Sequence, residues 1–323
     1  MNTFKWVLSN HLKYFQQNQK TNGFTLIELL VAMIIAFLVI TPLLGLMISI
    51  LTTDRQEQAK ATSEQEVQAA MDYITRDLQQ AIYIYDDEGV DAIKDELPTI
   101  TDGKPVLVFW KREFVKDVDK TKFTPTGGSE IQFNDDSFVN ALVAYYLIHN
   151  NAEPWSKAAR IARFQIKDGV PNRNGNTCPQ AYDTTIKYTL CPDPGFQPVD
   201  LFQTDKTLIE KMNSWEKADQ DYTQNTIVLV DFIDHTTTAK APLATCPTSD
   251  FKVVPSETTR TGFYACVNSI SSEKRSVAEV HIRGNALARF SNDTNNILYN
   301  PNQTSYFPTG RVRVEGRSFI FSK

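Results

Sequence analysis

The stretch KTNGFTLIELLVAMIIAFLVI, residues 20–40, decides the fold because it combines a long apolar run with one acidic residue. After Gly23, the run holds only Thr25 and Glu28 as polar side chains before Thr41. An uninterrupted apolar run of this length predicts a helix that lies in a membrane. A carboxylate at the centre of a bilayer costs about 2.5–3.5 kcal/mol on insertion scales, so Glu28 needs an explanation.

The apolar run extends from Phe24 to Leu51. At about 1.5 Å of rise per residue, a helix of this length spans roughly 40 Å, enough to cross a bilayer. Three lysines, at positions 5, 13 and 20, and no acid precede the run. By the positive-inside rule, we expect this short arm to be cytoplasmic and everything after Leu51 to be exported, as in a single-pass inner-membrane protein.

The position of Gly23 sets this segment apart from a secretory signal peptide, which places a small-residue cleavage site after its apolar stretch. No such site follows the run, and Gly23 precedes it. The string GFTLIE, residues 23–28, resembles the signature of type IV prepilins. The resemblance implies that a prepilin peptidase removes residues 1–23 by cutting after Gly23, and that Phe24 becomes the N-methylated first residue.

The same resemblance implies an assembly role for Glu28. In pilin assemblies, such a glutamate pairs with the amine of a neighbouring subunit, so that two charges neutralise each other in an apolar filament core. The partner of Glu28 is then another pilin or pseudopilin. The alternative is a carboxylate one turn from the membrane surface that reaches water and has no role.

An amphipathic helix is predicted to continue the anchor into the exported part. Apolar residues recur at spacings of three and four between Val67 and Tyr85, and no Gly or Pro interrupts residues 46–87. We therefore expect one helix from about Phe24 to Tyr85. Its membrane-spanning, filament-core half is residues 24–51 and its amphipathic half is residues 52–86.

Pro42 and Gly45 lie inside the anchor, where proline removes a backbone hydrogen bond and favours a kink. Pilins similarly carry a proline in this region, where the helix can loosen during assembly. The alternative is a kink of the kind that membrane helices tolerate without consequence.

Residues 87–323 are predicted to form an exported, β-rich globular head. An acidic, turn-rich loop over 86–96 leads into it, and the segments 170–180 and 191–198 are loops by composition. The sequence therefore predicts an α+β fold, pilin-like, in which the long helix packs on antiparallel sheet. Short runs rich in β-branched and aromatic residues predict the strands, at 105–112, 129–133, 141–150, 160–169, 226–234, 276–284 and 310–322.

Four cysteines lie in the exported part: Cys178, Cys191, Cys246 and Cys266. An even number in an oxidising compartment favours two disulfides, with three connectivities open. The sequential pairing closes the shortest loops, 178–191 and 246–266, and we prefer it. A zinc site competes with this interpretation, but no CxxC pair is present and the four histidines are scattered.

The order of the runs at 143–148, 159–166 and 227–233 resembles the head of J-type pseudopilins of type II secretion and of related minor pilins. Residues 23–87, about a fifth of the chain, resemble the C-type pseudopilins of cyanobacterial hormogonium polysaccharide secretion. That resemblance implies a type IV pilus-like machine for polysaccharide export and gliding motility. It implies as partners other pseudopilins, a prepilin peptidase, an inner-membrane assembly platform and the exported polysaccharide.

No set of residues in the sequence points to catalysis. Motifs for hydrolases, zinc proteases and phosphate binding are absent from the sequence, and we expect no enzyme, cofactor or metal. His235, beside Asp234, is predicted to lie where a strand ends and a turn begins. His281 is predicted to be a surface or core residue of a strand. Tyr145 and Tyr146 should point to opposite faces of a strand, one into the core and the other toward a sugar or a neighbouring subunit.

Three functional hypotheses remain: a minor pseudopilin, an adhesive or priming minor pilin, and a membrane-anchored periplasmic enzyme. The net charge of −5 argues against binding to nucleic acid. A bulky head is hard to repeat along a filament shaft, which favours a low-copy subunit. Because Glu28 needs a neighbour, we expect a place just below the filament tip.

Overall fold

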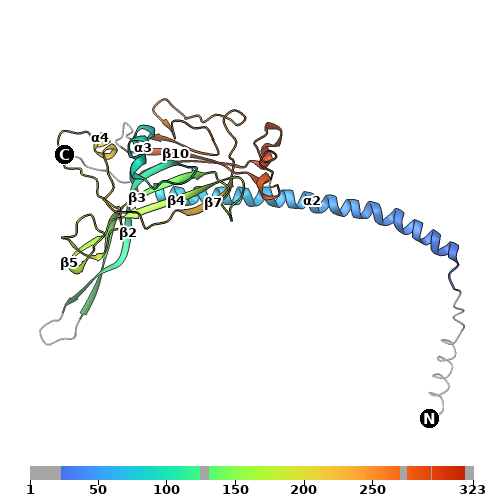
Figure 1. The fold of residues 1–323 in the computed structure, drawn as a ribbon, viewed down its shortest axis with the longest axis horizontal. Coiled ribbons are helices and arrows are strands. Elements are labelled where there is room, and N and C mark those ends of the chain that lie inside the picture. Colours follow the sequence, from blue (N-terminus) through green and yellow to red (C-terminus); the bar gives the residue numbers. More distant parts are fainter. Residues whose placement is uncertain (1–22, 124–130, 270–274, 292, 317–323) are drawn as a thin grey trace, which may run out of the picture. The chain divides into compact units, whose positions relative to one another are not determined.

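The computed structural model describes residues 23–123, 131–269, 275–291 and 293–316. The lysine-bearing leader before Gly23, the start of the run predicted at 129–133 and the end of the run predicted at 310–322 lie outside these ranges. The chain divides into two compact units, Met1–Arg55 and Gln56–Lys323. Each is described by itself below (Figure 1).

A single helix, α2 (Leu26–Leu78), continues from the first unit into the second. Residues 26–55 of the helix belong to the first unit, and the remaining residues form the start of the second unit. Its apolar side chains up to Leu51 are all exposed. In the second unit, the buried positions of α2 follow the spacing of three and four that was predicted: Ala59, Ser63, Val67, Ala70, Met71, Ile74, Asp77 and Leu78.

The helix ends at Leu78, and the prediction that it reaches Tyr85 is wrong. Residues Ala81–Ile84 form strand β1, which pairs antiparallel with β2 (Gly103–Phe123). Tyr83, Ile84 and Tyr85 are almost completely buried in this arrangement. A helix would bury only one face of this aromatic and β-branched segment, so the strand removes more apolar surface from water.

The head of the second unit is an α+β structure built on antiparallel sheet, as predicted. The largest sheet has five strands in the order β1-β2-β3-β4-β7. A second sheet has four strands in the order β11-β10-β9-β8. The other strands of these two sheets are β3 (Ile131–Ile148), β4 (Ala159–Lys167), β7 (Ile227–Ile233), β8 (Lys252–Val254), β9 (Phe263–Asn268), β10 (Val277–Arg283) and β11 (Thr309–Glu315).

The apolar stripe of α2 packs into one core with both sheets. Close approach of the helix to β11 depends on Gly310, where an added Cβ would lie 3.0 Å from side-chain atoms of both Val67 and Met71. Core residues from the five-stranded sheet include Val108 and Ala144. The helix is thus enclosed by strands from both sheets, which fixes its second half to the head.

Strands β2 and β3 form a hairpin that reaches beyond the other strands of its sheet (Figure 1). A smaller two-stranded sheet, β5 (Val170–Thr177) with β6 (Lys187–Leu190), covers one side of this hairpin. The prediction that residues 170–180 are loop is therefore wrong for β5, whose pairing with β6 is irregular enough to admit Pro, Asn and Gly.

The acidic segment that was predicted as a loop contains short helices instead. Residues 86–96 form α3 (Asp87–Ile93) and the 3₁₀ helix η1 (Lys94–Glu96). Asp86 caps α3 by accepting a hydrogen bond from the Gly89 backbone N–H at 3.0 Å. The remaining short helices are α4 (Leu208–Asn213), η2 (Ala286–Arg289) and η3 (Pro301–Tyr306).

Candidate functional site

The first candidate site is the start of α2, where the prepilin-like residues lie. The helix begins at Leu26, two residues after the predicted start. Thr25 caps it: its carbonyl oxygen accepts hydrogen bonds from the backbone N–H groups of Glu28 and Leu29, at 3.0 and 3.1 Å. Glu28 therefore lies in the first helical turn, where the helix dipole favours a negative charge.

Among the described residues of the first unit, no contact explains the choice of residues around the start of α2. A Cβ added to Gly23 would meet no atom within 4 Å, and Phe24 is 78% exposed. Glu28 is also exposed, and no side-chain hydrogen bond of its carboxylate is found in the part of the chain that the structure describes. These residues are free to meet other molecules.

The length and composition of α2 are sufficient to cross a membrane. The helix continues without a break through Pro42 and Gly45. Thr41 donates a hydrogen bond from its hydroxyl to the Phe37 carbonyl at 2.8 Å, in the turn where proline cannot donate. Local loosening of the helix at Pro42 stays a prediction.

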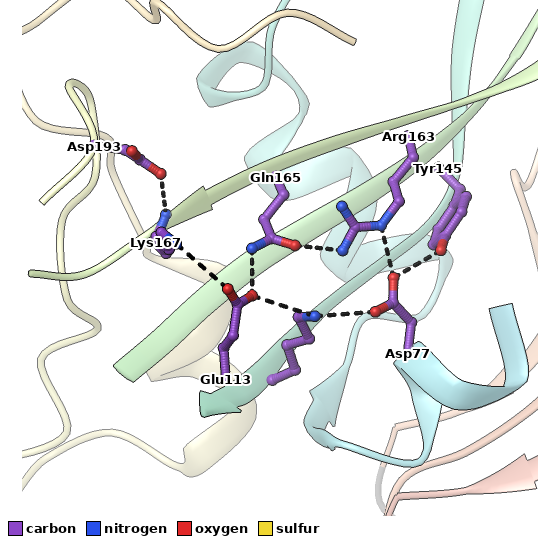
Figure 2. A network of polar contacts seen from close by, with 8 residues as sticks. Asp77, Glu113, Tyr145, Arg163, Gln165, Lys167 and Asp193 are labelled. Carbon is purple, nitrogen blue, oxygen red and sulfur yellow. Dashed lines mark hydrogen bonds and ion pairs between the residues drawn. The ribbon is translucent and has the colours of Figure 1, made fainter. Parts of the chain in front are cut away.

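The second candidate site fixes α2 to the head and is centred on Asp77, a carboxylate near the end of the apolar stripe (Figure 2). Lys111 on β2 donates to one of its oxygens at 3.0 Å. Arg163 on β4 and the Tyr145 hydroxyl on β3 both donate to the other oxygen at 2.7 Å. One helical carboxylate is thus bound to three neighbouring strands.

A second carboxylate, Glu113, extends the network along the sheet (Figure 2). It contacts Lys111 at 3.4 Å and Lys167 at 3.5 Å, and accepts a hydrogen bond from the Gln165 amide. The Gln165 carbonyl oxygen in turn accepts from Arg163, which closes a circuit back to Asp77. Charges of both signs therefore alternate, so that each buried ion has an opposite neighbour.

Burial and charge oppose each other in setting the pKa of Asp77. Burial alone would raise its pKa, but the hydrogen bond and positive charge of Arg163, helped by Lys111 and Tyr145, lower it overall. The pKa of Glu113 is lowered in the same way, against burial, by Lys111, Gln165 and Lys167. Both carboxylates are therefore ionised at neutral pH, as a balanced ion network requires.

A further set of contacts holds α2 near the start of the second unit. Arg289 donates a hydrogen bond to the Ser63 hydroxyl at 2.7 Å and pairs with Glu66. The Tyr306 hydroxyl donates to Gln56 at 3.1 Å, and the Lys60 ammonium lies 4.4 Å from the centre of its ring. The helix is thus attached to the head at two levels.

Both disulfides form with the sequential pairing that was predicted. Cys178 is bonded to Cys191, and Cys246 to Cys266, so no cysteine is free. The first bond closes the segment that carries β6, and the second joins a loop to β9. Each closed loop restricts the unfolded chain and so stabilises the head.

Tyr145 and Tyr146 are both buried, so the prediction that one of them is a contact residue is wrong. Tyr145 is fully buried and donates to Asp77. Tyr146 is 2% exposed, and its hydroxyl donates to the Pro98 carbonyl at 3.3 Å. The five-stranded sheet is covered on both faces at this position, so opposite faces of β3 are equally buried.

Three of the four histidines, His149, His235 and His281, lie in the described residues, and each stacks on another ring. His281 is half-buried, stacks on Tyr264 and contacts Glu279 at 2.9 Å. Asp234 forms an ion pair with Arg283 at 2.7 Å, and no hydrogen bond between Asp234 and the His235 ring is found in the described part of the chain. Across the described ranges, no group of three or more potential metal ligands is found.

His235 instead stacks on His149, with ring centroids 4.5 Å apart. His149 also lines a cavity of about 220 Å³ beside Arg260. Burial, helped by the neighbouring His235 and by Arg260, lowers the pKa of His149 to about 4. Burial likewise lowers the pKa of His235. Both rings are neutral at pH 7 and serve packing.

The stacked histidines predict a loss of stability in mild acid. Because the folded pKa of His149 is below its ordinary 6.5, the unfolded chain binds protons first. The stabilising effect of the neutral ring is therefore complete above about pH 6.5 and is lost as the pH falls toward 4. His149→Phe keeps the stacking and should flatten this dependence, as measured by thermal unfolding between pH 4 and 8. An equally steep loss in the variant would contradict the assignment.

The Asp77 network was missed by sequence reasoning, although a signal for it exists. Asp77 occupies a position on the apolar stripe, between Ile74 and Leu78. A carboxylate in that position must be paired when the stripe is buried. The identities of its partners, Lys111 and Arg163, depend on strand register, which the sequence does not specify.

Comparison with known families adds one finding to this geometry. Residues 18–44 match the family model of the prokaryotic N-terminal methylation motif. No curated protein and no solved structure matched the chain. The matched range contains Gly23, Phe24 and Glu28 and the first part of the apolar helix. The chain therefore carries a prepilin-type methylation motif on a helix fit for membrane anchoring, which supports a type IV pilin-like protein with an α+β head.

Proposed function

We propose that this chain is a minor pseudopilin of a filament that resembles a type IV pilus or a type II secretion system. The observation that carries the proposal is Glu28, an acidic residue within the methylation motif and in the first turn of α2, whose apolar side chains up to Leu51 are all exposed. Such a helix must be covered by lipid or by other helices. A carboxylate there is useful when a neighbouring subunit supplies a cation.

The proposal includes the processing and the location of the chain. A prepilin peptidase cuts after Gly23 and the new N-terminus, Phe24, is methylated. Before assembly, α2 anchors the chain in the inner membrane with a cytoplasmic leader and an exported head. An inner-membrane platform then moves the subunit into the filament. The two disulfides fit a head folded in an oxidising compartment.

We further propose a low-copy position just below the filament tip, in a machine that exports polysaccharide and supports gliding motility. The size of the head supports this position. The second unit spans Gln56–Lys323, whereas a single helix is only about 10 Å across, so heads of this size are hard to repeat along a shaft of closely packed helices. The resemblance of residues 23–87 to polysaccharide-secretion pseudopilins supports polysaccharide as the exported material.

A second candidate function is that of an adhesive minor pilin. Phe114 and Phe138 are paired across β2 and β3 on the exposed side of the long hairpin, 51% and 58% exposed. Arg112 lies over the Phe138 ring at 5.0 Å. Exposed aromatic pairs with a cation are typical of contact surfaces.

Glu28→Ala tests the assembly role. The variant should be processed and reach the membrane, but its incorporation into filaments should fall by about tenfold or more, because breaking a buried ion pair from one side costs about 3–5 kcal/mol, which exceeds the 1.4 kcal/mol of a tenfold change. Quantitative mass spectrometry of sheared filaments provides the measurement and also reports copy number relative to the shaft subunit.

Glu64→Ala is the matched control, because Glu64 is an exposed glutamate in the same helix within the second unit. It should assemble normally. Normal assembly of Glu28→Ala would instead favour a tethered enzyme, and an abundance equal to that of the shaft subunit would contradict the position near the tip.

A further inference from the structure

A groove of about 510 Å³ lies between α2 and β7 within the second unit. One wall is formed by the helix, with Ala69, Ala70 and Tyr73. The other wall is formed by the consecutive residues 228–232 of β7, and Trp155 closes one side. The small alanine side chains keep the helical wall low, which leaves the groove open.

The lining of the groove shows that it follows the backbone edge of β7. Successive side chains of a strand point to opposite faces, so a groove on one face would contact alternate residues. Here five residues in a row, 228–232, line the same groove. Only the edge of a strand, with its N–H and C=O groups, presents consecutive residues to one space.

This edge is open along most of its length. The five-stranded sheet ends at β7, and no strand in the described part of the chain pairs with residues 227–231 on the outer side. At the far end the edge is closed, because the Asn285 backbone N–H donates to the Phe232 carbonyl at 2.7 Å. Phe232 has a positive φ of 59°, which turns the strand away there.

The open edge also lacks most of the usual protection of an edge strand. Natural sheets protect their edges with lysine, proline, a covering segment or β-bulges; β7 has bulges in its pairing with β4, but its residues 227–230 are Ile-Val-Leu-Val, with no lysine or proline. Ile227 is 71% exposed, Tyr73 45% and Trp155 38%. Apolar surface of this extent on an unpaired edge is suited to a partner.

The charges that line the groove indicate what the partner carries. Its two charged lining residues are both carboxylates, Glu66 and Asp231. Glu66 is already paired with Arg289. Asp231 accepts hydrogen bonds from the Ser156 backbone N–H and hydroxyl and from the Phe232 backbone N–H, each at 2.8 Å. Its charge also acts on Arg160, but no ion pair of Asp231 is found among the described residues. A cationic group at the end of the groove would therefore be favoured.

We propose that the groove binds an extended segment of another polypeptide chain, which pairs with β7 as an added strand. Its alternate side chains are apolar and pack against Ala69 and Tyr73, and a lysine or arginine at its end meets Asp231. A helix would leave the N–H and C=O groups of β7 unpaired, because its own backbone bonds are internal. An added strand satisfies them and places its side chains in the groove.

This inference deepens the proposed function, since it names the chemistry of a partner that an assembling head would recruit. The two can fail separately. The processing and assembly role depends on Gly23 and Glu28 in the first unit, and the groove lies wholly in the second. A chain that assembles but binds no strand would overturn only the inference.

The test uses the full chain in nanodiscs of zwitterionic phosphatidylcholine and a fluorescein-labelled peptide, Lys-Thr-Val-Ile-Val-Thr-Lys, which has the proposed chemistry. Fluorescence anisotropy should show binding to the wild-type chain. Ala69→Trp fills the groove from an exposed helical position and should weaken binding about tenfold or more, or ~1.4 kcal/mol. Ala61→Trp, at an exposed alanine of the same helix that does not line the groove, should bind as the wild type does.

Two further measurements identify the mode of binding. A peptide N-methylated at alternate amides cannot pair with a strand edge and should not bind, and a peptide with glutamate at both ends should bind more weakly. Hydrogen exchange should show new protection of those backbone amides of residues 227–231 that point away from β4. Absence of binding, equal binding of the N-methylated peptide, or equal binding to Ala69→Trp would each overturn the proposal.

Discussion

Replacing Asp77 with alanine is expected to destabilise the head by about 3–5 kcal/mol, the usual cost of breaking a buried ion network from one side. The substitution leaves Lys111 and Arg163 as buried cations that face each other without a counter-charge. The free energy of unfolding can be measured in urea from the fluorescence of Trp110 and Trp215, which are 2% and 4% exposed in the native head.

Asp72→Ala provides the matched control, because Asp72 lies on the exposed face of the same helix. Its one side-chain hydrogen bond in the described part of the chain is accepted from Gln68 at 3.0 Å, and pairs of this kind contribute about 0.2–0.5 kcal/mol. Equal losses in the two variants would contradict the role given to Asp77.

Acid should reduce the difference between the wild type and Asp77→Ala. The pKa of Asp77 is below its ordinary 3.8 in the folded chain, so its contribution is complete above that pH. The contribution is lost as the pH falls through the folded value, because the carboxyl group then binds a proton and loses its charge. A difference that stays constant into strong acid would mean that the ion pairs contribute little.

Replacing Gly23 with valine is expected to leave a full-length precursor in the membrane. A β-branched side chain would obstruct close backbone approach by a peptidase. The fold is expected to be unaffected, because a Cβ at Gly23 meets no atom within 4 Å. The measurement is N-terminal sequencing together with the mass of the membrane-bound chain, and a wild-type start anywhere other than Phe24 would contradict the cleavage site.

Gly45→Val controls for a general effect of adding a side chain to a glycine of this region. A Cβ added to Gly45 would also meet no atom within 4 Å, but Gly45 lies inside α2, outside the matched range 18–44. The control should be processed to the same N-terminus as the wild type. Accumulation of precursor in both variants would point to impaired insertion instead of impaired recognition.

The sequence predicted features that depend on local pattern. The apolar anchor, the stripe that continues it and the pairing of the cysteines are all present, since periodicity and short loop closure are local properties. The end of the helix was misplaced because residues 81–85 are apolar at helical spacing and also rich in β-formers. Pairing with β2, a tertiary contact, decides between the two.

The site that attaches the helix could not be predicted from the sequence for a related reason. The partners of Asp77 are brought together by the register of β2, β3 and β4, in which Lys111 is opposite Ala141 and Tyr145 is opposite Arg163. A shift of one residue in either pairing would move these side chains to the other face. Local pattern in a strand that is buried on both faces does not fix that register.

Tension that passes along α2 into the head acts first on the contacts of Arg289 and Tyr306 and then on Asp77. The three partners of Asp77 come from β2, β3 and β4, which are neighbours in one hydrogen-bonded sheet. All three bonds converge on one carboxylate, so withdrawal of the helix from the sheet must break contacts to three strands at a single residue. The grip of the head on its helix at this level therefore depends on one side chain, and a single substitution there releases all three strands at once.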